Sequence, residues 1–324
     1  MRTLPAVLAV LWCSACHREP DPLPEPEESV QSRLEAHVVL LTSAHAERDA
    51  ANAEQLNQAG GMLAECLYEM GYTVEREVFT LPDGPEVFNV VAEVPGTAQG
   101  TVVIGAHYDV AAGTPGADDN ASGVAGVLEL ARRFRETTGR FGRTLRFVFF
   151  TTEEPPHYRM DTMGSLVHAR ASRARGDDIV AMIAVEMIGY FDDDPGSQRY
   201  PAMPGVKAAA GLPDVGDFIG VVTRRNDQGL LKAVVSEMDT DDRLPVVSLA
   251  LPETISGVGW SDHWSFWQAG YPAVMVTDTA FARNPNYHQP TDTYDTLDYD
   301  RMALVVDAIE RATTHLLGPT QTGP

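Results

Sequence analysis

Two adjacent glutamates, Glu153 and Glu154, follow an apolar run at residues 145–150 that predicts a buried strand. Two carboxylates side by side at the end of a strand repel each other and lose hydration. A fold retains them there only where a cation collects in front of them. A divalent metal ion meets this need best, so the pattern predicts a metal centre.

Side chains suited to zinc recur at the ends of other apolar runs and in one tight turn. Zinc in a hydrolytic site takes imidazole and carboxylate ligands and keeps one position open for water. Five ligands are one short of two ions with three protein ligands each, unless one carboxylate bridges the ions. Asp119 is the best bridge, because its Asp-Asn-Ala-Ser-Gly turn holds a short side chain that can offer both oxygens. The predicted ligands are His107, Asp119, Glu154, Glu186 and His288.

The charge count agrees with this division of roles. Two zinc ions carry four positive charges, which three carboxylate ligands and one bridging hydroxide would balance. Glu153 is then left without a metal ion. A carboxylate within reach of a metal-bound water can take its proton and later pass one to the leaving amine, so Glu153 is the predicted general base.

The order of these motifs resembles metallopeptidase family 28, which includes co-catalytic zinc aminopeptidases and also glutamate carboxypeptidase-like and glutaminyl cyclase-like members. The match runs from about residue 87 to the end of the last predicted helix. The motifs that carry it are His107-Tyr108-Asp109, the run Gly-Ala-Asp-Asp-Asn-Ala-Ser-Gly that begins at Gly116, Glu153-Glu154, Glu186-Met-Ile-Gly and Tyr287-His288.

The resemblance implies a role for each matching position. One zinc ion would bind His107, Asp119 and Glu186, and the other would bind Asp119, Glu154 and His288. Glu153 would be the base, Asp109 would orient His107, and Tyr287 would stabilise the oxyanion. The Asp119–Asn120 peptide would be cis. Aspartate is common in the family where this chain has Glu186, so a centre with a single metal ion stays open.

Four further residues are candidates for the substrate pocket: Trp260, Asp262, His263 and Arg283. Core packing for the tryptophan, and a helix start for the aspartate, explain the same pattern. The loop between Glu154 and Gly164 is longer than its family counterpart and carries two prolines. We therefore expect a rebuilt pocket wall and cannot copy specificity from relatives.

Strand-like and helix-like patterns alternate along most of the chain. This alternation predicts an α/β fold, a three-layer sandwich with a largely parallel mixed sheet of about eight strands and helices on both faces. Ligands bind beyond the carboxyl ends of such strands, where the candidate residues fall. Strands are expected at 74–79, 87–94, 102–106, 145–150, 179–188, 218–222, 246–249 and 273–276, and helices at 30–41, 54–70, from a cap at Asn120 or Ser122, and at 299–317.

The ends of the chain predict an exported protein. Residues 1–16 combine a positive start, a short apolar core and small residues, as in an export signal, with Cys16 as the candidate lipid-bearing residue. We expect residues 17–29 to be a tether rich in proline and acid, 30–318 to form one zinc peptidase domain, and 319–324 to be a disordered tail. The protein would lie in the periplasm or on the outer cell surface, lipid-anchored or otherwise secreted, and contact a membrane only through that anchor.

The composition of the chain limits the kinds of molecule that we expect it to bind. With a net charge of −22 over 324 residues, the chain offers no basic stripe for phosphates, which argues against nucleic acid. A peptide or small aminoacyl substrate fits instead. A structural disulfide is not expected, and the oligomeric state stays open.

The prediction is an exported zinc-dependent exopeptidase, foremost an aminopeptidase that uses a bridging metal hydroxide with Glu153 as base. A glutaminyl-peptide cyclotransferase and a catalytically silent binding protein are the alternatives. Carboxypeptidase or dipeptidase activity also stays open.

Overall fold

The computed structural model describes residues 28–82, 84–200, 205, 207 and 211–320. The predicted export signal, most of the tether and the last four residues of the tail lie outside these residues, and those predictions stay untested. Within the described part, no helix is both long and apolar enough to cross a bilayer.

A single eight-stranded sheet forms the middle layer, in the order β1-β2-β4-β3-β5-β8-β6-β7. Strands β4, β3, β5 and β8 run parallel to one another, whereas the β1–β2, β2–β4 and β6–β8 pairs are antiparallel. The predicted α/β class and mixed sheet are therefore confirmed. The strands are β1 (Val74–Thr80), β2 (Glu86–Val94), β3 (Thr101–His107), β4 (Thr144–Phe150), β5 (Ile179–Val185), β6 (Ile219–Arg224), β7 (Val246–Leu251) and β8 (Ala273–Thr277).

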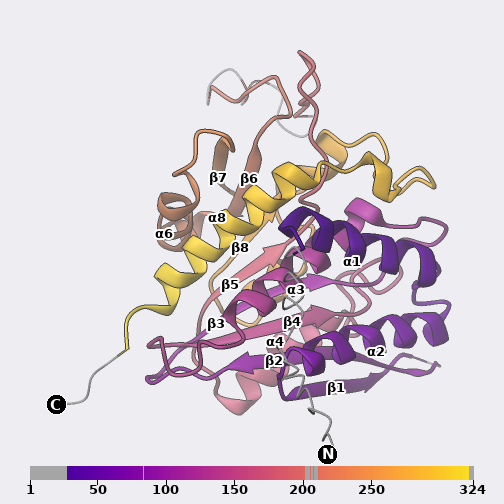
Figure 1. Ribbon diagram of the computed structural model, residues 1–324, viewed down its shortest axis with the longest axis vertical. Helices are drawn as coiled ribbons and strands as arrows, with labels where there is room; N and C mark the ends of the chain where they lie inside the picture. Colours follow the sequence, from indigo (N-terminus) through magenta and orange to yellow (C-terminus); the bar gives the residue numbers. More distant parts are fainter. Residues whose placement is uncertain (1–27, 83, 201–204, 206, 208–210, 321–324) are drawn as a thin grey trace, which may run out of the picture.

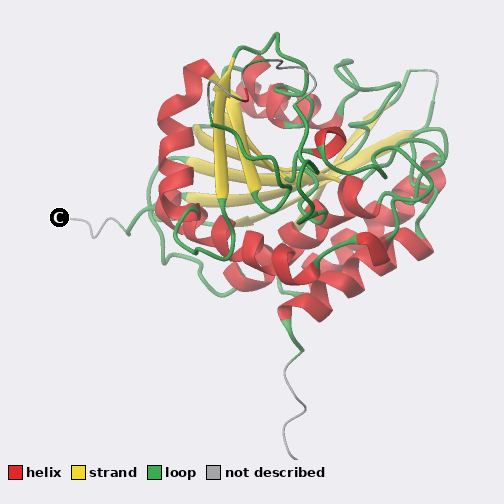
Figure 2. Ribbon diagram, turned by 90° about the horizontal axis from the view of Figure 1, so that it is seen from above, coloured by secondary structure: helices red, strands yellow, loops and turns green. Residues whose placement is uncertain are grey.

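Helices cover both faces of this sheet (Figures 1 and 2). The larger group packs on one face, with α1 lying outermost over α3 and α8. Helices α4 and α7 pack on the opposite face. The helices are α1 (Val30–Ala44), α2 (Ala53–Glu69), α3 (Gly123–Phe134), α4 (Gly164–Arg175), α6 (Gln228–Met238), α7 (His263–Gln268) and α8 (Tyr299–Leu317).

The apolar run of β4 explains why both faces need a cover. Alternate side chains of a strand point to opposite faces, and β4 is apolar on both. Phe147 and Phe149 belong to the core under the larger helical layer, whereas Val148 and Phe150 belong to the core under α4 and α7. Phe150 meets the Phe266 ring of α7 edge-on at 6.1 Å. Truncating such a buried phenylalanine to alanine typically costs about 3–5 kcal/mol.

Two differences from the sequence predictions lie next to candidate site residues. Strand β5 ends at Val185 rather than at residue 188, because Met187 adopts a positive φ of 51° and turns the chain out of the sheet. Before α3, residues Ala117–Ser122 form a kinked turn. Asn120 is the capping residue there, since its Oδ1 accepts the Gly123 N–H at 3.1 Å.

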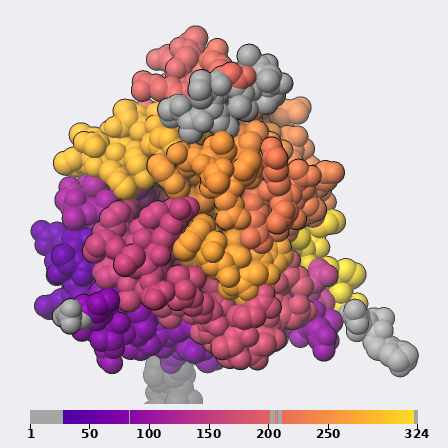
Figure 3. All heavy atoms as spheres, turned by 180° about the vertical axis from the view of Figure 1, so that it is seen from behind, coloured from indigo at the N-terminus to yellow at the C-terminus, as the bar shows by residue number. Residues whose placement is uncertain are grey.

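Segments far apart in the sequence share one surface. Seen from behind, the middle of the chain and its C-terminal part lie side by side (Figure 3). A contact between them is direct, because the Tyr158 hydroxyl donates to the Gly259 carbonyl at 2.9 Å.

Candidate metal centre

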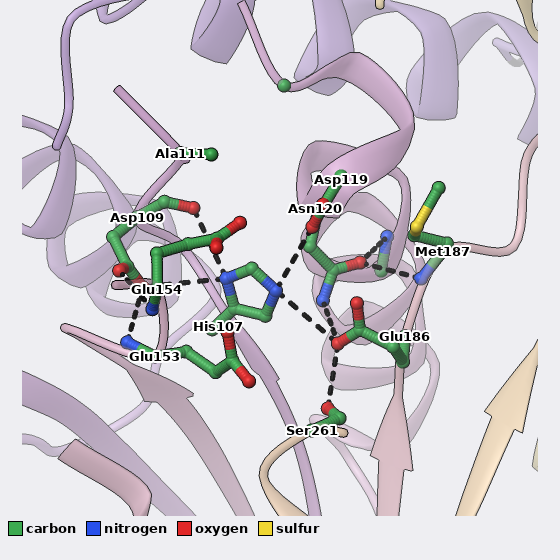
Figure 4. Close-up of polar contacts among 12 residues, drawn as sticks. His107, Asp109, Ala111, Asp119, Asn120, Glu153, Glu154, Glu186, Met187 and Ser261 are labelled. Carbon is green, nitrogen blue, oxygen red and sulfur yellow. Dashed lines mark hydrogen bonds and ion pairs between the residues drawn. The ribbon is translucent and has the colours of Figure 1, made fainter. Parts of the chain in front are cut away.

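The predicted ligands follow the four parallel strands in the middle of the sheet. His107 ends β3, Glu154 follows β4, Glu186 directly follows β5, and His288 lies in the loop after β8. Because these strands are neighbours and run in the same direction, their carboxyl ends meet at one edge. Asp119 reaches the same edge from the turn before α3 (Figure 4).

The five side chains form two groups that share Asp119. In the first group, His107 Nε2 lies 3.3 Å from both Asp119 Oδ1 and Glu186 Oε2. In the second, His288 Nε2 lies 3.1 Å from Asp119 Oδ2 and 3.2 Å from Glu154 Oε1. The two oxygens of Asp119 thus face different groups, as a bridging carboxylate requires.

These separations fit zinc. Ligand atoms about 2.0–2.1 Å from a tetrahedral zinc ion lie about 3.3–3.4 Å apart, close to the contacts observed here. The tautomer of His107 adds a second argument. Its Nδ1 lies 3.2 Å from the Asp109 carbonyl oxygen, which can only accept a hydrogen bond. In the neutral ring Nε2 then carries a lone pair that faces two carboxylate oxygens, an arrangement that a metal ion between them satisfies.

Asp109 joins the His107 loop to the paired glutamates. Its Oδ1 accepts the Glu153 N–H and its Oδ2 accepts the Glu154 N–H, each at 3.0 Å. Oδ1 also lies 3.4 Å from His107 Nδ1. One buried carboxylate therefore positions three functional residues, more than the orientation of His107 that the resemblance implies (Figure 4).

Asp292 holds the turn that presents Asp119. Its two oxygens accept the N–H groups of Asp118 at 2.9 Å and of Asp119 at 3.1 Å. The Asp119–Asn120 peptide is cis, as the resemblance implies. Sequence reasoning missed Asp292, because one aspartate in a polar loop gives no sign that it is buried four residues after a ligand.

Glu186 is held from two sides. The Ser261 hydroxyl donates to Glu186 Oε2 at 2.7 Å, and Asn120 Nδ2 donates to the same oxygen at 3.4 Å. Asn120 also accepts the Met187 N–H at 3.0 Å, which fixes the turn after β5. The longer glutamate side chain thus reaches His107 with a defined orientation (Figure 4).

The comparisons with known proteins agree with this geometry. A model of peptidase family M28 matches residues 89–313. The chain belongs to peptidase family M28. It is 43% identical over 293 residues to the uncharacterized protein YfbL of Escherichia coli K12, a match that covers 88% of each chain. It is 30% identical over 242 residues to leucine aminopeptidase 1 of Fusarium vanettenii, where the match covers 71% of this chain and 55% of that protein.

Solved structures of low sequence identity show the same fold. The zinc aminopeptidase BSAP of Bacillus subtilis matches with a TM-score of 0.67 and 14% identity, over 91% of this chain and 96% of that one. The glutaminyl cyclase of Porphyromonas gingivalis matches with a TM-score of 0.62 and 19% identity, over 87% and 96%. The fold alone therefore admits both kinds of enzyme.

In this M28 chain, one side chain joins the two ends of the long loop between β4 and α4, which bears the two glutamates. Buried Asn89 on β2 accepts the Thr151 N–H at 3.0 Å and donates to the Gly164 carbonyl at 2.9 Å. The tip of the loop docks on Gly259, whose carbonyl accepts from the Tyr158 hydroxyl and from Arg159 Nη2, each at 2.9 Å. The loop is therefore held at its base by Asn89 and at its tip by the Gly259 carbonyl.

Burial is the largest influence on the pKa values of Glu153 and Glu154. It raises the pKa of Glu153 well above its usual range; His107 opposes this effect, and Glu154 adds to it. Burial and then Asp119 raise the pKa of Glu154 to about 7. Such a concentration of raised carboxyl pKa values is typical of a functional site, and cations placed among these groups would lower them.

Tyr287 lies at the edge of the same group. Its ring stacks on the His288 ring with centroids 3.9 Å apart. Burial, followed by the charge of Asp119, raises the pKa of the Tyr287 phenol. The phenol therefore stays protonated at neutral pH and can donate a hydrogen bond.

A largely apolar, open cavity adjoins the metal centre at Glu186 and Tyr287. Strands β6, β7 and β8 supply part of its lining. Trp260, a predicted pocket residue, lies on its surface. The apolar lining includes Val222, Leu249, Leu251, Trp260, Met275 and Phe281.

The other three predicted pocket residues are buried and do not belong to the lining of this cavity, which corrects that expectation. Asp262 and His263 are fully buried, and His263 Nε2 donates to the Val258 carbonyl at 2.7 Å. Arg283 donates through Nε to Gln198 Oε1 at 2.9 Å. These bonds direct His263 and Arg283 to neighbouring protein atoms. The two carboxylate oxygens of Asp262 have no hydrogen-bond partner among the described residues. In the described part of the chain, Asp262 makes no side-chain capping bond at the start of α7.

Proposed function

We propose that this M28 peptidase is an aminopeptidase that removes N-terminal residues from small peptides at a centre of two zinc ions. The observation that carries the proposal is the pair of imidazole–carboxylate groups that share Asp119, with Glu153 beside them. Each group offers three ligands, which leaves positions open for water and substrate.

Bound zinc ions would polarise the scissile carbonyl and lower the pKa of a water molecule. Glu153, the acid that belongs to neither ligand group, takes the proton from the attacking water and delivers it to the leaving amine. The Tyr287 phenol donates to the oxyanion that develops on the carbonyl oxygen. Both side chains border the proposed reaction centre, Glu153 beside Glu154 and Tyr287 stacked on His288.

The apolar cavity supports a preference for bulky, uncharged N-terminal side chains. Glu186 and Tyr287 belong to its lining. An N-terminal side chain of the substrate bound in the cavity would therefore place the first peptide carbonyl near the ligand groups. Apolar linings bind apolar side chains because their burial removes that surface from water. The acids around the centre attract the free amino group of a peptide. The leucine aminopeptidase among the relatives agrees with this preference.

The decisive experiment follows hydrolysis of leucyl 4-nitroanilide by the purified protein. We expect activity that a strong chelator abolishes and that added zinc restores, with two zinc ions per chain in the active form. Activity untouched by complete removal of metal would refute the proposal. Faster hydrolysis of leucyl than of glutamyl or lysyl anilides would support the assignment of the cavity.

Cyclisation of N-terminal glutamine is the second candidate, because a glutaminyl cyclase has this fold. The same preparation tests it with a glutaminyl peptide, where cyclisation releases ammonia and leaves the next peptide bond intact. Release of free glutamine would instead support the aminopeptidase.

Export of the protein is also part of the proposal, and it rests on the N-terminal sequence alone. Mass spectrometry of the mature N-terminus would distinguish a lipid on Cys16 from simple cleavage. An intact Met1 in the cell-envelope fraction would contradict both.

A further inference from the structure

Arg48 is a fully buried arginine in the connection between α1 and α2. Its guanidinium donates to the carbonyl oxygens of Tyr108 at 2.7 Å, Pro115 at 2.8 Å and Gly116 at 2.8 Å. Two longer bonds, of 3.3 and 3.4 Å, go to carbonyls of Leu41 and His45. The planar fork thus joins the end of α1 to two places in the segment between β3 and α3.

This arrangement is unusual for a buried charge. Buried arginines commonly pair with a carboxylate, because desolvation of an unpaired charge is costly. In the described residues no carboxylate oxygen forms an ion pair with Arg48, which binds carbonyl oxygens only. Burial lowers the pKa of Arg48 to about 10, against the charges of Asp109 and Asp292, so the side chain remains cationic at neutral pH.

The bonded carbonyls lie beside two predicted metal ligands. Tyr108 directly follows His107, and Gly116 precedes Asp119 by three residues. Asp119 and Asp109 are also among the acids that act on the charge of Arg48. The guanidinium therefore fixes the backbone next to His107 and in the turn that leads to Asp119, and its positive charge acts on Asp119.

Gly116 packs tightly against the Arg48 guanidinium and the Asp119 backbone. Its φ is +64°, and a Cβ at this position would lie 2.2 Å from Val110 Cγ1, 2.5 Å from the Asp119 carbonyl oxygen and 3.0 Å from Arg48 Nη2. Only glycine allows the guanidinium to approach this turn without displacing the Asp119 backbone.

We propose that Arg48 is a positioning residue of the metal centre, which holds His107 and Asp119 in register for the ion bound between them and Glu186. The inference rests on the proposed zinc centre. It assigns part of the site to the α1–α2 layer, which lies outside the region that the M28 family model matches. The second ligand group depends on Arg48 only through Asp119. A change at Arg48 should therefore reduce the zinc affinity of the second group less than that of the first.

The test measures zinc affinity by competition with a chromophoric chelator. In a His288→Ala background the first group is the stronger remaining site, and in a His107→Ala background the second group is. We expect Arg48→Lys, which keeps the charge but cannot span three carbonyls, to weaken zinc binding about 10- to 100-fold in the His288→Ala background. The loss in the His107→Ala background should be several-fold smaller.

Arg133→Lys is the matched control. Arg133 is an arginine of α3 that pairs with Glu129, Asp307 and Glu310, away from the ligand groups. We expect this variant to lower the melting temperature without a change in zinc affinity. Arg48→Gln, which keeps an NH₂ donor without the charge, provides a second variant if Arg48→Lys does not fold.

The outcomes separate the two proposals. Equal losses of zinc affinity in both backgrounds would overturn the positioning role, and so would parental zinc affinity in the Arg48 variants. The proposed function would still stand if the parent protein binds zinc. A parent protein that binds no zinc would contradict the proposed function itself, and the inference with it.

Discussion

Asp109 Oδ1 accepts the main-chain N–H of Glu153 at 3.0 Å. This bond ties the loop after β3 to the loop after β4, so the predicted base and the predicted ligand His107 are positioned by one buried carboxylate. The energy of such a contact is modest, but its geometry bears on every step in which Glu153 moves a proton.

Asp109→Asn tests this relationship. The new NH₂ group cannot accept an N–H, so one of the two amides at Glu153 and Glu154 loses its partner. We expect kcat for leucyl 4-nitroanilide to fall about 10- to 100-fold, with weaker zinc binding. The control is Asp161→Asn, because Asp161 is an exposed aspartate with 87% of its side chain accessible. Equal kcat in Asp109→Asn and the control would count against the role of Asp109.

Glu153→Gln tests the general base. The amide has nearly the same shape as the carboxylate but cannot take a proton from water. We expect kcat to fall about 10²- to 10⁴-fold with unchanged zinc content, because Glu153 belongs to neither ligand group. Kinetics and metal analysis on one preparation check both halves. Wild-type turnover would remove Glu153 from its role, whereas loss of zinc would make it a ligand.

Val222→Phe tests the cavity. Val222 lies on the cavity surface with Leu249 and Met275, so a larger ring there reduces the space for a substrate side chain. We expect kcat/KM for leucyl 4-nitroanilide to fall about tenfold relative to the alanyl substrate, in line with about 1–3 kcal/mol for a methylene-sized mismatch. The same substitution at exposed Val78 is the control. An unchanged substrate ratio would place the substrate side chain elsewhere.

His263 predicts a pH-dependent stability. Burial lowers its pKa in the folded protein from 6.5 to about 4. Between these values the unfolded chain binds a proton that the folded chain does not, so stability is complete above pH 6.5 and falls as the pH drops toward 4. The loss from this group is on the order of 3 kcal/mol.

Urea denaturation of the wild type and of His263→Gln between pH 4 and pH 7 measures this contribution. Glutamine can still donate to the Val258 carbonyl but does not titrate in this range. The free-energy difference between the two proteins should therefore change with pH in favour of the variant on acidification. Parallel pH curves would show that His263 does not titrate as described.

The local pattern of the sequence determined the elements and the chemistry of the candidate site. Apolar runs such as 145–150 are buried on both faces, and this produces strands whose ends carry His107, Glu154 and Glu186. Hydrophobic periodicity is a local property, which is why the alternation of strands and helices and the ligand types follow from the order of the residues alone.

The packing of distant segments brings these residues into contact and determines their surroundings. The sheet order makes the ends of β4, β3, β5 and β8 neighbours, and this brings His288 to Asp119. Nothing in the local sequence marks Arg48 as buried, or Arg283 as buried outside the lining of the cavity. Burial and hydrogen-bond partners depend on packing between segments distant in the chain, so only the folded protein reveals them.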